Sequence, residues 1–301
     1  VVVDIKATGI SFPDVLIVQG LYQFKPPFPF SPGSEISGVV SSVGEGVTMH
    51  KQGDRVMGSI GSGGLREKGV YLEQQLMPLP ETMDFNTAAG FPLNYGTTYH
   101  AFKQRGELKA GQSVLVLGAG GGLGITAIHI AKAMGAKVIA AASSQEKIDL
   151  CKKEGADEGI IYEREMDRDL QKKFSDQIKE VTGGGVDMIY DLVGGDYAEP
   201  ALRAIARHGK YLVIGFTAGI PKMPLNLTLL KECQIVGVFW GQFAGVEYAE
   251  NQQNFKELFD LHAEGKIKPF VTETYALDES ATAIKTLEDR KVLGKVVVSM
   301  E

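Results

Sequence analysis

The sequence predicts an α/β protein in which a β-rich domain is followed by a doubly wound parallel sheet. Residues 1 to 95 are rich in Gly and Pro, and turn signals such as "KPPFPFSPG" and "SVGEGV" separate short β-like runs. From Thr97 onward, short apolar runs alternate with helical patterns. This alternation is typical of parallel strands with helices on both faces of the sheet.

These patterns define the expected elements. In the first domain we expect a mainly antiparallel sheet with strands at Val1–Ala7, Ser37–Val43, Arg55–Gly58 and Tyr71–Gln75. In the second domain we expect strands at Ser113–Gly118, Lys137–Ala142, Gly159–Tyr162, Val186–Asp191, Lys210–Gly215 and Ile235–Phe239. The helices between them are expected at Leu123–Met134, Gln145–Glu154, Asp167–Val181 and Tyr197–Ala206. The last segment predicts helices at Ala249–Glu264 and Ala281–Glu288 and a closing strand at Lys295–Met300.

Composition excludes several classes of protein. The chain has 301 residues, of which 44% are hydrophobic and 23% charged, which allows a sizeable core and two domains. The net charge of −6 argues against nucleic acid or an anionic membrane as the main partner. No apolar run approaches the roughly 20 residues of a membrane span. We therefore expect no nucleic-acid partner and no membrane partner.

The two cysteines, Cys151 and Cys233, lie far apart in the chain and cannot form a disulfide framework. Their scarcity is typical of a reducing compartment, so we expect a cytoplasmic protein. The chain begins with the strand-like "VVVDIKATG" and without Met. We therefore expect the natural N-terminus to be trimmed, and a mitochondrial location stays open.

The stretch "VLVLGAGGGLG", Val114 to Gly124, places glycines between a strand and a helix. Glycines let the backbone approach a pyrophosphate, and the helix N-terminus favours its negative charge. A flexible turn is the alternative, but the position inside a series of βα units favours a Rossmann dinucleotide site. The motif is A-x-G-x-x-G, and we expect the pyrophosphate to contact Ala119, Gly121, Gly122, Leu123 and Gly124.

The end of the next strand indicates which dinucleotide binds. An NAD site usually has an acid there, but this strand ends "IAAASSQEK", with no acid before Glu146. Two hydroxyls, Ser143 and Ser144, can donate to a 2′-phosphate, and Lys147 can supply a positive charge. The sequence therefore predicts NADPH, although Lys147 alone would also fit a solvated helix lysine.

Motifs along nearly the whole chain carry a family resemblance. They include "ATGISFPDVLIVQGLYQFKPPFPFSPGSEISGVV", "GDRVMG", "YGTTYHAF", "VLGAGGGLG", "DLVGG" and "GKVVVS". With these motifs the chain resembles the zinc-free quinone oxidoreductases of the medium-chain dehydrogenase/reductase superfamily. The resemblance implies a GroES-like catalytic domain at residues 1–95, with 266–301 returning to it, and a Rossmann NADPH-binding domain at 96–265. It also implies an active site in the cleft between them and a homodimer formed through the sheet edge at Ile235–Phe239.

The resemblance further implies roles for single residues. In this branch, the 2′-phosphate is held by residues that match Ser143, Lys147, Tyr162 and Arg290. Thr97 in "YGTTYHAF" matches a threonine near the nicotinamide, and Gly215 and Phe239 match residues that line the cofactor.

Zinc members of the superfamily place a Cys ligand in "ATGVCHTD" and a His ligand in "GHE". This chain has Ser11 and Ser34 at those positions, and neither cysteine lies in the first domain. A hydroxyl is a poor zinc ligand, so we expect no metal site. The five histidines are scattered, and we expect them to be structural.

Without a metal, hydride must go to an acceptor that is already electrophilic, such as a quinone or an α,β-unsaturated carbonyl. Tyr22 in "VQGLYQF" matches a site tyrosine of related reductases and is the candidate proton donor, with Thr97 the second expected catalytic residue. Aromatic packing on Pro26 and Phe28 is the alternative for Tyr22. Two other functions stay open. One is an enoyl-thioester reductase, and the other is a non-catalytic NADPH-binding protein of the crystallin or trafficking type.

Overall fold

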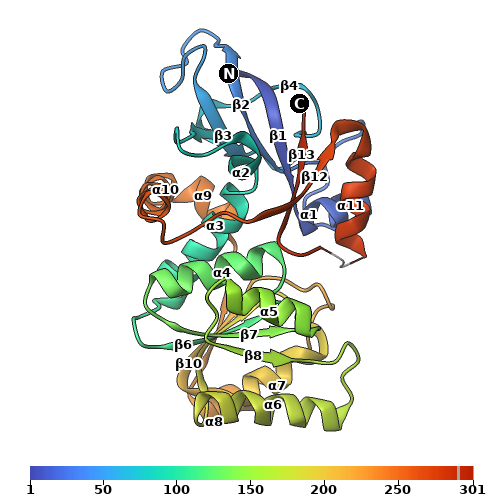
Figure 1. The fold of residues 1–301 in the computed structure, drawn as a ribbon, viewed down its shortest axis with the longest axis vertical. Coiled ribbons are helices and arrows are strands. Elements are labelled where there is room, and N and C mark those ends of the chain that lie inside the picture. The colour runs from blue at the N-terminus through green and yellow to red at the C-terminus, as the bar shows by residue number, and fades with distance from the viewer. Residues whose placement is uncertain (290–291, 301) are drawn as a thin grey trace. The chain divides into compact units, whose positions relative to one another are not determined.

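The computed structural model of the chain describes residues 1–289 and 292–300. The chain divides into two units, one made of Val1–Asn94 with Pro269–Glu301, the other of Tyr95–Lys268 (Figure 1). The boundaries expected after residues 95 and 265 fall within a few residues of these limits. The expected residue Arg290 lies outside the described residues.

The first unit is built on a mixed sheet with strand order β12-β13-β1-β2-β3-β5, in which β4 also pairs with β1. Its elements are β1 (Val2–Ile10), α1 (Phe12–Val18), β2 (Glu35–Ser42), β3 (Arg55–Ser59), β4 (Lys68–Val70), η1 (Glu73–Gln75), β5 (Leu76–Pro78), α2 (Phe85–Ala89), β12 (Val271–Ala276), η4 (Leu277–Glu279), α11 (Ser280–Glu288) and β13 (Lys295–Ser299). β1 pairs antiparallel with both β2 and β13, so the last strand of the chain returns to the first.

Alternating side chains build the core of this unit. Val3 and Ile5 of β1 pack with Ile36 and Val40 of β2 in one buried cluster, as the period of two in a strand requires. The strand expected at Tyr71–Gln75 is wrong. The Gln75 side chain accepts a hydrogen bond from the Leu72 backbone N–H at 3.0 Å, which closes the short helix η1, and the next strand is β5.

The second unit is a parallel sheet with strand order β11-β10-β9-β6-β7-β8. Its elements are α3 (Pro92–His100), which begins in the first unit, the π-helical turn η2 (Ala101–Gly106), β6 (Ser113–Leu117), α4 (Gly122–Ala133), β7 (Lys137–Ala142), α5 (Gln145–Lys153), β8 (Glu158–Ile161), α6 (Arg168–Thr182), β9 (Val186–Asp191), η3 (Gly195–Tyr197), α7 (Ala198–Arg203), β10 (Ile205–Val213), α8 (Asn226–Lys231), β11 (Gln234–Gly237), α9 (Trp240–Val246) and α10 (Tyr248–Ala263). In Figure 1, α4 and α5 lie on one side of this sheet and α6 and α7 on the other, which confirms the doubly wound arrangement.

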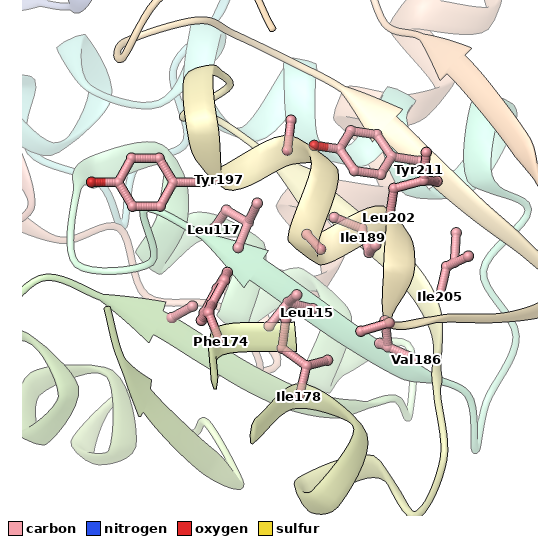
Figure 2. Packing of buried hydrophobic residues seen from close by; sticks show 14 of the residues in the cluster. Leu115, Leu117, Phe174, Ile178, Val186, Ile189, Tyr197, Leu202, Ile205 and Tyr211 are labelled. Atoms are coloured by element: carbon pink, nitrogen blue, oxygen red, sulfur yellow. The ribbon is translucent and has the colours of Figure 1, made fainter. Parts of the chain in front are cut away.

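The two helical layers explain why the central strands are apolar throughout. Leu115 and Leu117 of β6 pack with Phe174 and Ile178 of α6, as Figure 2 shows. The alternate residues Val114 and Val116 are equally buried and point to the opposite face. Strands buried on both faces read as continuous apolar runs rather than as alternating ones.

One expected helix, Tyr197–Ala206, is too long. The structure has a 3₁₀ turn that ends at Tyr197, and α7 then ends at Arg203. Ile205 already pairs with Val186 of β9, so β10 begins well before the expected Lys210. The sheet pairing of Ile205 therefore overrides the helical pattern there.

Candidate functional site

The glycine loop lies between β6 and α4. Gly118 has φ +76°, a conformation that favours glycine, and it turns the chain away from the strand. Gly121 is the N-cap of α4, and no side chain caps this helix end. The N–H groups of the first turn are therefore available to an anion, whose charge the helix dipole also favours.

Two glycines of this loop are needed for different reasons. A Cβ on Gly124 would lie 2.5 Å from the carbonyl oxygens of both Gly118 and Ala119, so close packing of α4 on the loop requires glycine there. A Cβ on Gly121 would meet only the Gly118 carbonyl oxygen, at an ordinary 3.7 Å. The protein leaves room at Gly121, as the close approach of a ligand phosphate requires. The loop therefore fits a dinucleotide pyrophosphate.

The end of β7 provides a hydroxyl and an ammonium. Ser144 is the N-cap of α5, and its hydroxyl oxygen accepts a hydrogen bond from the Lys147 backbone N–H at 3.4 Å. Ser143 precedes this cap and is partly buried. The Lys147 side chain lies against Gly120, where an added Cβ would come within 2.8 Å of Lys147 Cβ. Lys147 is thus brought directly to the glycine loop.

Further expected residues lie at the same carboxyl edge of the sheet. Tyr162 follows β8, and its backbone N–H donates to the Ala142 carbonyl oxygen at 3.0 Å, which sets it beside Ser143. Its ring packs against Phe174 and Tyr197. Gly215 follows β10, and Phe239, which follows β11, is 56% exposed at the start of α9. Ligands of doubly wound sheets bind at this edge.

Sequence reasoning missed the role of Asp191, at the carboxyl end of β9. Its carboxylate accepts hydrogen bonds from the backbone N–H groups of Val193 and Gly194 and, at 2.6 Å, from the Tyr211 hydroxyl. Burial raises the pKa of this carboxyl, and these three donors oppose that effect. Asp191 therefore holds the loop after β9. The acid directly before "LVGG" was the available signal.

The two expected catalytic residues belong to different units. Thr97 lies in α3 and is partly buried. Its neighbour Gly96 faces the Trp240 ring, and the Thr98 hydroxyl hydrogen-bonds to that of Tyr190 at 2.9 Å. Tyr22 follows α1 in the first unit and is partly buried. Burial and then the negative charge of Asp14 raise the pKa of the Tyr22 phenol, which keeps it protonated at neutral pH.

A buried charged cluster surrounds Ser11 in the first unit. The Lys295 ammonium donates to Ser11 Oγ at 2.6 Å and also contacts Glu35 Oε2. Glu35 is fully buried, and its other carboxylate oxygen accepts from the Leu93 N–H at 2.7 Å. Ser11 could be predicted from the sequence, whereas Lys295 and Glu35 could not, because these two residues lie far apart in the chain.

Asp14 fixes the serines of this region. Its carboxylate accepts hydrogen bonds from the backbone N–H groups of Ser11 and Gly33, both at 2.9 Å, and from the Ser34 hydroxyl at 3.4 Å. Burial raises the pKa of Asp14 to about 6, although the two backbone donors and Lys295 act in the opposite direction. Asp14 therefore has a structural role at the start of α1.

Within residues 1–289 and 292–300, no group of three or more His, Cys, Asp or Glu side chains is placed to hold a metal ion. Across the same residues, no helix is both long enough and apolar enough to pass through a bilayer.

The family models and the relatives that match this chain all belong to the dehydrogenases and quinone oxidoreductases. Residues 1–81 match the family model "Alcohol dehydrogenase GroES-like domain", and residues 122–264 match "Zinc-binding dehydrogenase". The chain is 37% identical to the quinone oxidoreductase-like protein 2 homolog of Nematostella vectensis, over 99% of this chain and 80% of that protein. It is 33% identical to the quinone oxidoreductase of Rattus norvegicus, over 99% of this chain and 88% of that protein.

Among solved structures, the chain resembles Escherichia coli quinone oxidoreductase complexed with NADPH. The TM-score is 0.90 and the identity 31%, with 99% of this chain and 90% of that chain covered. The likeness therefore extends through both units.

Proposed function

The chain belongs to the quinone oxidoreductase branch of the medium-chain dehydrogenase/reductase superfamily, and on that basis we propose that it is an NADPH-dependent, zinc-independent reductase of quinones or α,β-unsaturated carbonyls. The observation that carries the proposal is the carboxyl edge of the parallel sheet. The uncapped start of α4, the open space beside Gly121 and Lys147 lie together there. An added Cβ on Gly121 would come no closer than 3.7 Å to any described atom beyond its chain neighbours.

Each part of this edge would hold one part of the cofactor. The loop from Ala119 to Gly124 would bind the pyrophosphate through backbone N–H groups. Ser143, Lys147 and Tyr162 would bind the 2′-phosphate, because a hydroxyl and an ammonium suit its charge. Thr97, Gly215 and Phe239 would contact the nicotinamide half. When bound, NADPH supplies the hydride, while the chain orients the reactants.

Tyr22 would deliver the proton. Its raised pKa keeps the phenol protonated, so it can donate to the oxygen on which charge develops during enone reduction. A quinone needs this proton less, because the hydroquinone anion is stable enough to take one from water. An alcohol would need a base instead, and the raised pKa of Tyr22 disfavours that role.

The Ser11 cluster supports zinc independence. Zn²⁺ prefers thiolate and imidazole, whereas Ser11 and Ser34 offer hydroxyls. The Lys295 ammonium is already bound to Ser11 Oγ, and a fixed positive charge repels a second cation at the same place. Metal analysis of the purified protein should therefore find no stoichiometric zinc, and one tightly bound zinc per chain would contradict this part of the proposal.

The reaction itself is tested by following NADPH absorbance with 9,10-phenanthrenequinone, a simple enone and an enoyl thioester. We expect turnover of the quinone or the enone and no comparable alcohol oxidation with NADP⁺. Faster turnover of the enoyl thioester would favour an enoyl-thioester reductase. NADPH binding without any turnover would favour a non-catalytic role.

We further propose that the chain forms a homodimer through the β11 edge of the sheet. Within the described residues, β11 pairs only with β10, and Ile235 on it is 36% exposed. The preceding helix α8 exposes Leu229 and Leu230, and an exposed apolar strand edge favours association. Light scattering after gel filtration should give a dimer, and Ile235→Lys should shift it toward the monomer. A monomeric wild type would contradict the proposal.

A further inference from the structure

Two buried side chains and one partly buried carboxylate form a chain of contacts inside the second unit. The Tyr95 hydroxyl lies 3.3 Å from His129 Nδ1, and His129 Nε2 lies 2.8 Å from Glu154 Oε2. Tyr95 is 2% exposed and His129 is 6% exposed. The three residues come from α3, α4 and the C-cap of α5, so the contacts join elements that are separate in the sequence.

The chemistry of the three groups fixes where the protons lie. An ionised Glu154 carboxylate only accepts, so His129 Nε2 carries a hydrogen and donates it. Burial lowers the pKa of His129 and raises that of Tyr95. His129 is therefore neutral, its Nδ1 accepts, and the Tyr95 hydroxyl donates to it. Tyr95, His129 and Glu154 then each have a hydrogen-bond partner, as a buried polar network requires.

The chain of contacts reaches the glycine loop. The Thr126 side chain also lies against the Tyr95 hydroxyl, whose single hydrogen is donated to His129 Nδ1. The Thr126 hydroxyl donates to the Gly122 carbonyl oxygen at 2.9 Å, and Gly122 is the first residue of α4. Tyr95 thus contacts the first turn of α4 through one intervening side chain.

We propose that Tyr95, His129 and Glu154 are positioning residues that fix the first turn of α4 for binding of the dinucleotide. This inference rests on the proposed NADPH site at the glycine loop. Tyr95 also lies two residues before Thr97 on α3, so the same contacts relate the pyrophosphate end of the site to its nicotinamide end. A shift of either end costs affinity, because one bound ligand must contact both ends at once.

The test compares two tyrosines of the same helix. Tyr95→Phe removes only the hydroxyl of this chain of contacts. The matched control, Tyr99→Phe, removes a hydroxyl that donates to Glu257 at 2.6 Å, away from the glycine loop. Calorimetric titration with NADPH should show a Kd about three- to tenfold higher for Tyr95→Phe, the range for one neutral hydrogen bond, and an unchanged Kd for Tyr99→Phe. Thermal unfolding of both variants is measured in parallel.

A second pair of variants tests the contact between Glu154 and His129. Glu154→Gln keeps an oxygen that accepts from His129 Nε2, so its Kd for NADPH should stay near that of the wild type. Glu154→Ala removes the acceptor and should raise the Kd as Tyr95→Phe does.

Each outcome has a distinct meaning. A wild-type Kd for NADPH in Tyr95→Phe and Glu154→Ala, with lowered thermal midpoints, would overturn the inference and leave these residues as fold stabilisers. The proposed function would survive that result. A wild type that binds no NADPH would overturn both.

Discussion

Lys147 lies across Gly120, so that a Cβ on this glycine would come 2.8 Å from Lys147 Cβ and 2.9 Å from its Cγ. The missing side chain at position 120 is what lets the lysine stem follow the loop. Gly120 is thus required by a neighbouring side chain, whereas Gly124 is required by the backbone beneath it. The same loop therefore shapes both the expected pyrophosphate site and the expected 2′-phosphate site.

The first prediction concerns cofactor preference. Lys147→Ala should weaken NADPH binding by about 1–3 kcal/mol, the range for a charged hydrogen bond, and leave NADH binding nearly unchanged. Lys147→Met is the matched control for the stem, since it keeps the aliphatic contacts with Gly120 and removes the charge. Calorimetric Kd values for both cofactors provide the measurement. Equal losses for NADPH and NADH would show that Lys147 does not bind the 2′-phosphate.

The second prediction concerns Gly124. Gly124→Ala places a Cβ 2.5 Å from two carbonyl oxygens, so the helix or the loop must move. The free energy of unfolding should fall by about 1–3 kcal/mol, as for overpacked sites, and NADPH affinity should fall with it. Gly245→Ala is the control, because a Cβ there meets nothing within 4 Å. Urea unfolding of both variants tests this, and equal stabilities would contradict the packing argument.

The third prediction concerns Tyr22. If the phenol donates the proton, Tyr22→Phe should slow enone reduction by about 10²–10⁴-fold, the range for general acid catalysis. Reduction of 9,10-phenanthrenequinone should fall less, because its product anion can take a proton from water. The measurement is kcat/KM for both substrates in wild type and variant. An unchanged enone rate would remove Tyr22 from the mechanism without changing the reaction class.

The fourth prediction concerns the pH dependence of stability. Burial lowers the pKa of His129 below its unfolded value of about 6.5, an effect to which Lys268 adds and which Glu154 partly opposes. Below that value the unfolded chain binds more protons than the folded one, so this residue costs stability as the pH falls. Between about pH 7.5 and about pH 5.5, the free energy of unfolding measured in urea should therefore fall more for wild type than for His129→Gln. A smaller loss in wild type would reverse the assignment of a neutral histidine.

The sequence predicted the parts of the fold that depend on local pattern. Strands such as Lys137–Ala142 and Val186–Asp191 have the expected limits, because a strand buried on both faces is one uninterrupted apolar run. The short helix α1 at Phe12–Val18 was not predicted. It is held by the Asp14 contacts to Gly33 and Ser34, which lie outside the helix.

The candidate site could likewise be predicted only where it has a local sequence signature. A strand followed by glycines has a local signature, and so does a strand end without an acid. The contact of Lys295 with Glu35 has none, because the two residues are separated by most of the chain. The Tyr95–His129–Glu154 chain of contacts also has no signature, since a scattered histidine looks the same whether it faces solvent or a carboxylate.

The pairing of β1 with β13 has a consequence for how the chain matures. The second unit is one continuous segment, so all its contacts are available once residue 268 has left the ribosome. The sheet of the first unit cannot be completed at that stage, because β1 pairs with β13, which is synthesised nearly 290 residues later. Until then the Ala7–Ile10 part of one edge of β1 remains unpaired in the nascent chain, with the exposure to aggregation that such edges bring. The order of synthesis therefore favours folding of the inserted unit first, with the terminal strand completing the other.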